Sequence, residues 1–264
     1  MQKSDTDFTI RHGDVLEHLR DESIGTFDTV IPSPPYNCGI EYDGCTDDME
    51  PIIYFEWIET VASLVGQRLR PGGYAIWNVP NYLGNRSERI YALDEYKSIF
   101  SRHVPFDDLI IWKKHPPHNA AWGCPPHRPR IRAEHEWLIV THAPGGERYE
   151  TGIDMADWSR WTRSVWEVLP TPHPLHPATF PLEIARRLVM LYSPAGRASG
   201  SISRGPTATW RKPPAPKAIS SVRVPDAGRR IHLPEDPASG GDPRSTVAPR
   251  SRPRCPALAV LCQA

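Results

Sequence analysis

The 264-residue chain is 39% hydrophobic and 23% charged, and it has no apolar run near the roughly 18 residues of a membrane span, which excludes a membrane protein. Its N-terminus opens no apolar signal segment and its five cysteines form no Cys-x-x-Cys pair, so we expect a cytoplasmic protein with reduced thiols. Residues 197–264 hold twelve Lys or Arg against four Asp or Glu and are therefore basic. Residues 1–196 hold nineteen against twenty-seven and are acidic, so any nucleic-acid groove in this larger part must be local.

Strands and helices alternate along the first three quarters of the chain. Apolar patterns predict strands at residues 8–10, 27–31, 74–79, 109–112 and 136–140. Helical periodicity covers residues 15–19, 52–69 and 181–192. In the last helix the residues predicted to face inward are Leu182, Ala185, Leu188 and Val189. This alternation predicts an α/β fold with a largely parallel, Rossmann-like sheet and helices on its faces.

Beyond Gly196 the composition changes. Residues 197–264 contain eleven prolines, ten arginines and one aromatic residue, and they show no periodic apolar stretch before residues 257–261. Such a segment cannot offset its ordering entropy by burial. We therefore predict one domain over residues 1–196 and a basic, mostly disordered tail over residues 197–264.

The tetrapeptide Ser33-Pro34-Pro35-Tyr36 directly follows a predicted strand, where open α/β sheets place their active sites. An exocyclic amine on a nucleobase is a poor nucleophile, because its lone pair is delocalised into the ring. Ser33 can supply an acceptor for an amine hydrogen, the Pro34 carbonyl a second acceptor, and Tyr36 a stacking face for an extruded base. A polyproline turn that merely caps the strand is the structural alternative.

These residues resemble motif IV of the amino-directed (N-4/N-6) DNA methyltransferases, and the order of the segments resembles the circularly permuted β class. His12-Gly13-Asp14 is similar to the segment before motif IV, which implies that Asp14 lies near the adenine of S-adenosylmethionine. The stretch from His176 to Pro181 resembles motif X, which binds the methionine end of that cofactor. By this resemblance the cofactor-binding residues there are His176, Pro177 and Phe180.

The resemblance implies methyl transfer from S-adenosylmethionine to an exocyclic amine of a flipped base in double-stranded DNA. Serine at position 33 favours cytosine N4 over adenine N6, because the adenine enzymes usually show Asp or Asn there. Methylation of a cytosine carbon is disfavoured, since no cysteine of this chain follows a proline. The family also allows a cognate restriction endonuclease as a partner, and the sequence leaves the oligomeric state open.

One expected motif is missing. In the permuted order, motif X should be followed by an apolar strand and a Phe-x-Gly-x-Gly turn that cradles the cofactor, but residues 197–205 show neither. Our hypothesis is that residues from about 197 onward are a frameshifted or otherwise decayed terminus, which would impair activity. The alternatives are a catalytically dead DNA-binding remnant and an RNA or protein methyltransferase with the same motif type.

A loop rich in His, Pro and Arg, residues 113–132, is the predicted DNA-facing element. The candidate DNA-binding residues are Lys113, Lys114, Arg128, Arg130 and Arg132. A solvated loop without function is the alternative. The loop also contains His115-x-x-His118 and Cys124-x-x-His127, a spacing that zinc can use. Its prolines already explain a rigid loop, so we expect no metal.

Residues 147–175 occupy the place where the resembled family keeps a target-recognition segment. The segment contains Trp158 and Trp161, each followed closely by an arginine. Packing of these tryptophans in the core is an equally good explanation, and the sequence does not decide between the two.

Overall fold

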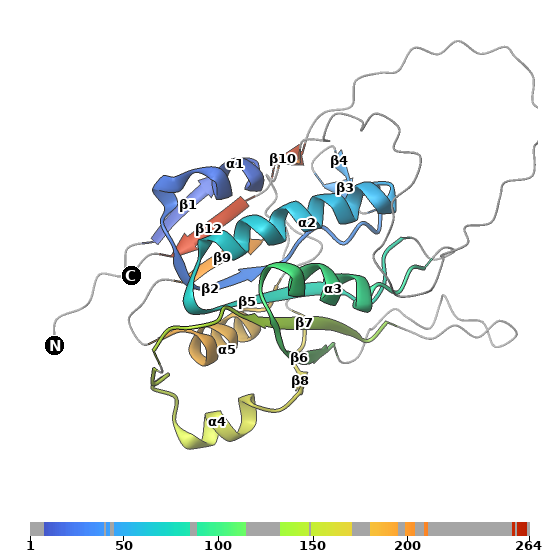
Figure 1. Ribbon diagram of the computed structural model, residues 1–264. Helices are drawn as coiled ribbons and strands as arrows, with labels where there is room; N and C mark the ends of the chain where they lie inside the picture. Colours follow the sequence, from blue (N-terminus) through green and yellow to red (C-terminus); the bar gives the residue numbers. More distant parts are fainter. Residues whose placement is uncertain are drawn as a thin grey trace, which may run out of the picture.

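A computed structural model describes the chain over eleven ranges of residues. These are residues 8–39, 41–42, 45–84, 89–114, 133–147, 149–170, 180–194, 199–203, 209–210, 255–256 and 258–262. They form an α/β fold in which helices cover both faces of one large sheet (Figure 1), as the sequence predicts.

The large sheet has eight strands in the order β1-β12-β9-β2-β5-β7-β6-β8. Their bounds are β1 Phe8–His12, β2 Phe27–Pro32, β5 Leu69–Pro80, β6 Phe106–Lys113, β7 His135–His142, β8 Val165–Glu167, β9 Ser199–Ser203 and β12 Leu258–Cys262. The pairings β9–β2, β2–β5 and β6–β8 are parallel, and those that β7 and β12 form with their neighbours are antiparallel. The other six strands therefore all run in the same direction.

Two short antiparallel pairs lie outside the large sheet. They join β3 (Glu41–Tyr42) to β4 (Cys45–Thr46), and β10 (Thr209–Trp210) to β11 (Cys255–Pro256). The helices are α1 Val15–Arg20, α2 Pro51–Arg68, α3 Leu93–His103, α4 Met155–Trp161 and α5 Leu182–Tyr192, with a short 3-10 helix at Glu22–Ile24.

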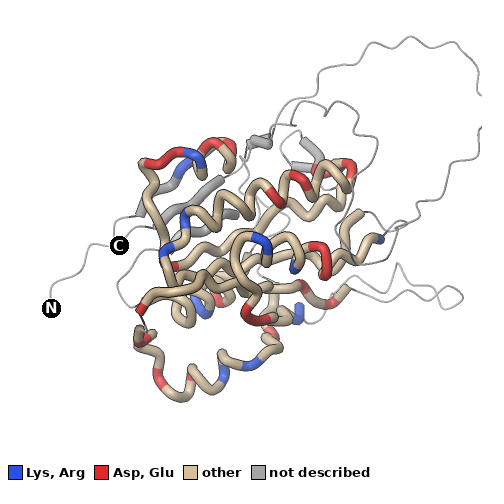
Figure 2. Tube along the Cα trace, viewed as in Figure 1, with Lys and Arg blue, Asp and Glu red and all other residues tan. Residues whose placement is uncertain are grey.

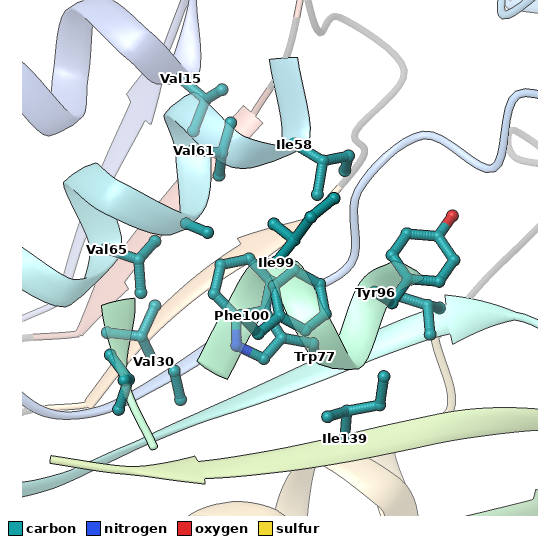
Figure 3. Close-up of a cluster of buried hydrophobic side chains, with 14 of the residues drawn as sticks. Val15, Val30, Ile58, Val61, Val65, Trp77, Tyr96, Ile99, Phe100 and Ile139 are labelled. Atoms are coloured by element: carbon teal, nitrogen blue, oxygen red, sulfur yellow. The ribbon is translucent and has the colours of Figure 1, made fainter. Parts of the chain in front are cut away.

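The larger core lies between the sheet and helices α1, α2 and α3. Helix α2 begins at Pro51, whose fixed φ suits a first helical position, and its inward face includes Ile58 and Val65. Trp77 of β5 stacks on Phe100 of α3 with ring centroids 4.1 Å apart, and both rings are buried in the cluster shown in Figure 3. The stacking of Trp77 on Phe100 holds β5 against α3.

Helix α5 covers the opposite face of the sheet, and its inward residues differ in part from the prediction. Leu188 is buried as expected, but Leu182 is 81% exposed and Val189 also points to solvent. Ile184 takes the second core position instead. The prediction failed at Leu182 because this residue begins the helix, so no preceding helical turn lies beside it.

Two strands of the large sheet come from the segment that we predicted to be disordered. β9 adds to the edge of β2 in parallel, and β12 lies between β9 and β1. The structure gives residues 199–203 and 258–262 as strands, and a mostly disordered tail over residues 197–264 stays a prediction. An unpaired edge of β2 offers hydrogen bonds to any extended segment, whatever its hydrophobicity. The domain boundary at residue 196 stays a prediction.

The segment after β7 folds into α4 and the edge strand β8. Trp161 and Trp166 are each 1% exposed and belong to the interior, whereas Trp158 is 41% exposed. Core packing therefore explains Trp161. Because its ring is partly exposed, Trp158 stays a candidate for target recognition.

Candidate active site

The site lies at the edge of the sheet where β2 and β5 end. From β2 the chain crosses through α2 to β5 on one side, while β9 pairs with β2 on the other side. Strand order thus reverses around β2, and such switch points at the carboxyl ends of parallel strands form ligand-binding crevices. The loop 33–37 begins there, as predicted.

A buried pair of tyrosines fixes the middle of this loop. The Tyr54 hydroxyl donates to the Pro35 carbonyl at 2.7 Å and lies 2.8 Å from the Tyr96 hydroxyl. Burial, followed by the neighbouring Tyr54, raises the pKa of Tyr96 well above its usual range, so the hydroxyl stays protonated. Within the described residues, no hydrogen bond reaches the Pro34 carbonyl, which leaves it available as an acceptor.

Asn37 closes the loop with an unusual backbone conformation. Its φ is +50°, a value that asparagine tolerates better than most side chains. Its side-chain amide donates to the Met49 carbonyl at 2.8 Å and accepts from the Met49 N–H at 2.6 Å. Its own carbonyl accepts from the Gly84 N–H at 2.9 Å. The loop is therefore tied both to the start of α2 and to the turn after β5.

A buried polar network ties Ser33 and Tyr36 to the neighbouring strands. The Tyr36 hydroxyl lies 2.8 Å from both Asn78 Oδ1 and Glu136 Oε2, and Ser33 Oγ lies 3.4 Å from Asn78 Oδ1. Asn78 Nδ2 donates to Glu136 Oε2 at 3.0 Å, and Lys114 pairs with Glu136 Oε1. We call Tyr36, Asn78, Glu136 and Lys114 the Asn78 network.

The network lies on the face of the sheet that α5 covers. Asn78 and Glu136 each lie two residues along their strand from Ile76 and Leu138, and therefore on the same face of the sheet as these side chains, which pack in the α5-side core. Phe180, just before α5, packs edge-on against Trp112 at 6.1 Å, and the Lys114 ammonium lies 4.7 Å from the same indole ring. A continuous series of contacts thus joins Tyr36 to Phe180, the two ends of the predicted site.

The other predicted cofactor residues are placed in part. Asp14 is buried at the carboxyl end of β1, at the same sheet edge as Ser33, and its Oδ1 accepts from the Leu16 N–H at 2.8 Å. It therefore also caps α1. His176 and Pro177 lie outside the described residues.

The predicted DNA-binding lysines are already engaged with carboxylates. Lys113 pairs with Glu167 at 2.7 Å, and Lys114 belongs to the Asn78 network. Arg128, Arg130 and Arg132 lie outside the described residues, as do the four residues with zinc spacing. In the described part of the chain no group of three His, Cys, Asp or Glu side chains could hold a metal ion. Figure 2 shows basic positions scattered among acidic ones over the described elements.

Sequence analysis missed Asn78 and Glu136. Both are polar residues inside apolar strands, and their side chains are 1% and 6% exposed. A buried polar side chain needs a hydrogen-bonding partner, so each was a sign of a specific polar contact. The partners could not be found from the sequence, because β5 and β7 are neighbours in space but separated by α3 and β6 along the chain.

Comparison with known families identifies this arrangement. The model of the N6/N4 family, described as DNA methylase, matches residues 27–198, a span that runs from β2 past α5. The chain belongs to this DNA methylase family. The methylases of this family take their methyl group from S-adenosylmethionine, which is therefore the cofactor of this protein.

Curated relatives agree with this family. The chain is 40% identical to the type II methyltransferase M.ScaI of Streptomyces caespitosus over 72 residues, which are 27% of this chain and 22% of that protein. It is 24% identical to the type II methyltransferase M.MjaVI of Methanocaldococcus jannaschii over 154 residues, which are 56% of this chain and 78% of that protein. The match to M.ScaI therefore spans about a fifth of that protein's length.

Solved structures support the fold. A candidate DNA modification methylase from Thermus thermophilus superposes with a TM-score of 0.52 and 23% identity, over 75% of this chain and 78% of that chain. The cytosine-N4-specific PvuII DNA methyltransferase superposes with a TM-score of 0.50 and 16% identity, over 69% of this chain and 68% of that chain.

Within the described residues, no helix is both long and apolar enough to cross a membrane.

Proposed function

We propose that this protein methylates the exocyclic amino group of cytosine, at N4, in double-stranded DNA. This proposal rests on one observation. Just after the carboxyl end of β2, the side chains of Ser33 and Tyr36 both contact Asn78 Oδ1 of β5. A hydroxyl and an aromatic ring held by one buried amide form a rigid receptor for a planar base bearing an amine.

The residues of the loop divide the work. Tyr36 offers its ring as the surface on which a base that has left the duplex stacks. Ser33 Oγ and the Pro34 carbonyl accept the two amine hydrogens, which draws the nitrogen toward tetrahedral geometry and frees its lone pair. Tyr54 holds the Pro35 carbonyl and so prevents the loop from turning its acceptors inward. When bound, S-adenosylmethionine supplies the electrophilic methyl group on its sulfonium.

The described residues fit part of that cofactor. The half-buried Phe180 ring, already packed on Trp112, offers an apolar surface, and the buried Asp14 carboxylate can accept from a hydroxyl or amine with its second oxygen. We propose that Phe180 and Asp14 contact the two ends of the cofactor, together with His176 and Pro177. The glycine-rich cradle expected after α5 has no counterpart in the sequence, and we keep the hypothesis that the chain is altered beyond residue 196 and that its activity is impaired.

The choice of cytosine rests on Ser33. A neutral hydroxyl occupies a position where the adenine-N6 enzymes usually carry Asp or Asn. Adenine N6 is the alternative acceptor, and a catalytically dead DNA-binding remnant is the second alternative. A cognate restriction endonuclease remains an expected partner, in keeping with the type II names of the two curated relatives.

The proposal is tested by expressing the chain in a bacterial host that lacks DNA methylation and analysing the nucleosides of its genomic DNA by mass spectrometry. We expect N4-methylcytosine above background with the natural chain and none with Ser33→Ala. N6-methyladenine alone would establish the alternative enzyme. Absence of both, together with retained DNA binding, would establish the remnant.

The altered-terminus hypothesis has its own test. Sequencing the genomic locus should reveal a Phe-x-Gly-x-Gly segment in another reading frame shortly after the codon for residue 196. Calorimetry with S-adenosylmethionine should then show tighter binding for the chain with the frame restored than for the present one. Equal affinities of the two chains would contradict the hypothesis.

A further inference from the structure

The direction of one proton decides what Ser33 can do. A hydroxyl donates one hydrogen bond and accepts through its lone pairs, so it serves as an acceptor for a substrate amine only when its proton points elsewhere. Asn78 Oδ1, 3.4 Å from Ser33 Oγ, is an oxygen that accepts and cannot donate. The contact between them therefore forms only with the Ser33 proton directed at Asn78.

Glu136 fixes which end of the Asn78 amide faces Ser33. An amide side chain can turn by 180° and exchange its oxygen and nitrogen. Here Nδ2 donates to Glu136 Oε2 at 3.0 Å, and a turned amide would set its oxygen against a carboxylate oxygen. Lys114 binds the other carboxylate oxygen, Oε1, so both oxygens of Glu136 serve as acceptors. The turned state is thereby disfavoured.

Burial protects this arrangement from water. Asn78 and Glu136 are almost fully buried, so a solvent molecule does not readily replace either partner. The Tyr36 hydroxyl lies 2.8 Å from Asn78 Oδ1 and 2.8 Å from Glu136 Oε2, and its single proton is donated to one of these two oxygens at a time. The orientation of Asn78 therefore sets the acceptor on Ser33 and also anchors the ring beside it.

We propose that Glu136, acting through Asn78, is a positioning residue that turns the Ser33 proton away from the substrate, so that Ser33 Oγ accepts a hydrogen from the target amine. The catalytic part of this statement rests on the proposed function, whereas the ordering of the proton is a property of the folded chain alone. The orientation of Asn78 also determines which side chains at position 33 can hydrogen-bond to it. Ser or Asn can give a proton to Asn78 Oδ1, but an ionised Asp cannot.

A matched pair of variants tests the ordering without DNA or cofactor. Ser33→Asn keeps an N–H for Asn78, whereas Ser33→Asp places an oxygen against it once the carboxyl ionises. The titratable groups of the surrounding network are Tyr36, Glu136 and Lys114. We expect the Tm of Ser33→Asp to fall below that of Ser33→Asn by about 3 °C at pH 8, with a smaller gap at pH 5 where the new carboxyl is partly protonated.

The second half of the test is a rescue. Glu136→Gln supplies an amide that can donate to a turned Asn78, which then offers its nitrogen to Asp at position 33. In this background the Tm gap between the two variants should close. Glu134→Gln removes the same charge at an exposed position two residues away and should leave the gap open. A gap that persists with Glu136→Gln, or that closes equally with Glu134→Gln, would overturn the proposal.

Hydrogen exchange and methyl-transfer kinetics test the same positioning role in other ways. If Ser33→Asp does not fold at either pH, hydrogen exchange of the Asn78 side-chain amide is measured instead, with Ser33 left unchanged. We expect exchange about tenfold faster in Glu136→Gln than in Glu134→Gln. Equal rates would overturn the proposal.

In methyl transfer to unmethylated plasmid DNA, Glu136→Gln should lower kcat about tenfold with KM within about twofold. No transfer by the natural chain would count against the proposed function, while the Tm comparison would still judge the proton ordering.

Discussion

The two sides of the site are held together in different ways. On the target side, formed by loop 33–37 with β5 and β7, the hydrogen bonds of the Asn78 network join residues 22 to 100 positions apart. On the cofactor side, the side-chain hydrogen bonds of Asp14 and Arg11 reach residues only 2 to 12 positions away, although α1 itself is tied to Arg68 through the carbonyls of Leu19 and Arg20. A substitution in the Asn78 network should therefore affect the stability of the whole fold, and one at Asp14 mainly a local contact.

The largest effect is expected for Glu136→Ala. It leaves a Lys114 ammonium and the Asn78 Nδ2 group without their acceptor, and breaking a buried ion pair from one side is strongly destabilising. We expect the free energy of unfolding to fall by about 3 kcal/mol, because Lys114 keeps some contact with water. Urea unfolding measures this, with exposed Glu134→Ala as the control. A loss of unfolding free energy no larger than that of Glu134→Ala would show that the Asn78 network does not stabilise the fold.

Tyr54→Phe should come next. The change removes one oxygen and leaves the Pro35 carbonyl and the Tyr96 hydroxyl without a buried partner. We expect a loss of about 2 kcal/mol in urea unfolding. Tyr91→Phe, at a residue that is 60% exposed, is the matched control and should be neutral. Equal effects of the two changes would show that loop 33–37 does not depend on its tyrosine anchor.

On the cofactor side, Asp14→Asn separates the cap from the charge. Asparagine caps a helix as well as aspartate does, so the stability should change by less than about 0.5 kcal/mol, whereas Asp14→Ala should cost about 1 kcal/mol. Both variants should weaken S-adenosylmethionine binding relative to the natural chain, measured by calorimetry. Unchanged affinity in Asp14→Asn would limit Asp14 to the role of a helix cap.

The smallest effect concerns Asp21. Hydrogen bonds from Ser23, then from Arg11, lower the pKa of this carboxyl to about 2. A lowered pKa stabilises the fold above the unfolded value near 4, and that contribution is lost as the pH falls from about 4 to 2. Thermal melts of Asp21→Asn should therefore show a flatter decline across this window. A decline identical to that of the natural chain would remove Asp21 from the acid response.

Much of the target side was open to prediction from the sequence. The strand before Ser33, the helix ending near Arg68 and the strand bearing Asn78 all show patterns of short period, and the motif residues follow one strand directly. Helix α3 was missed although Tyr96, Ile99 and Phe100 recur at helical spacing, because the segment between the strands was given no element. Local patterns therefore predicted where the loop begins but not what holds it.

The partners of the loop could not be predicted, for a physical reason. Glu136 meets Tyr36 only because β7 inserts antiparallel between β5 and β6, and no local pattern of residues encodes that position in the sheet. For strand β9 the strand itself was also unpredictable. Its residues have only a weak strand pattern, and it forms because the edge of β2 offers it backbone hydrogen bonds.

The proposed function requires that a base leaves the duplex and stacks on Tyr36, with its amine held by Ser33 Oγ and the Pro34 carbonyl. Photocrosslinking tests it most directly, because it requires neither the cofactor nor knowledge of the recognition sequence. A pool of random duplexes carrying 5-iodocytosine is irradiated with the full chain, and the crosslinked peptide is identified by mass spectrometry. We predict a crosslink at Tyr36 that is absent from a matched 8-bromoadenine pool. Crosslinks confined to other residues in both pools would show that cytosine does not stack on Tyr36.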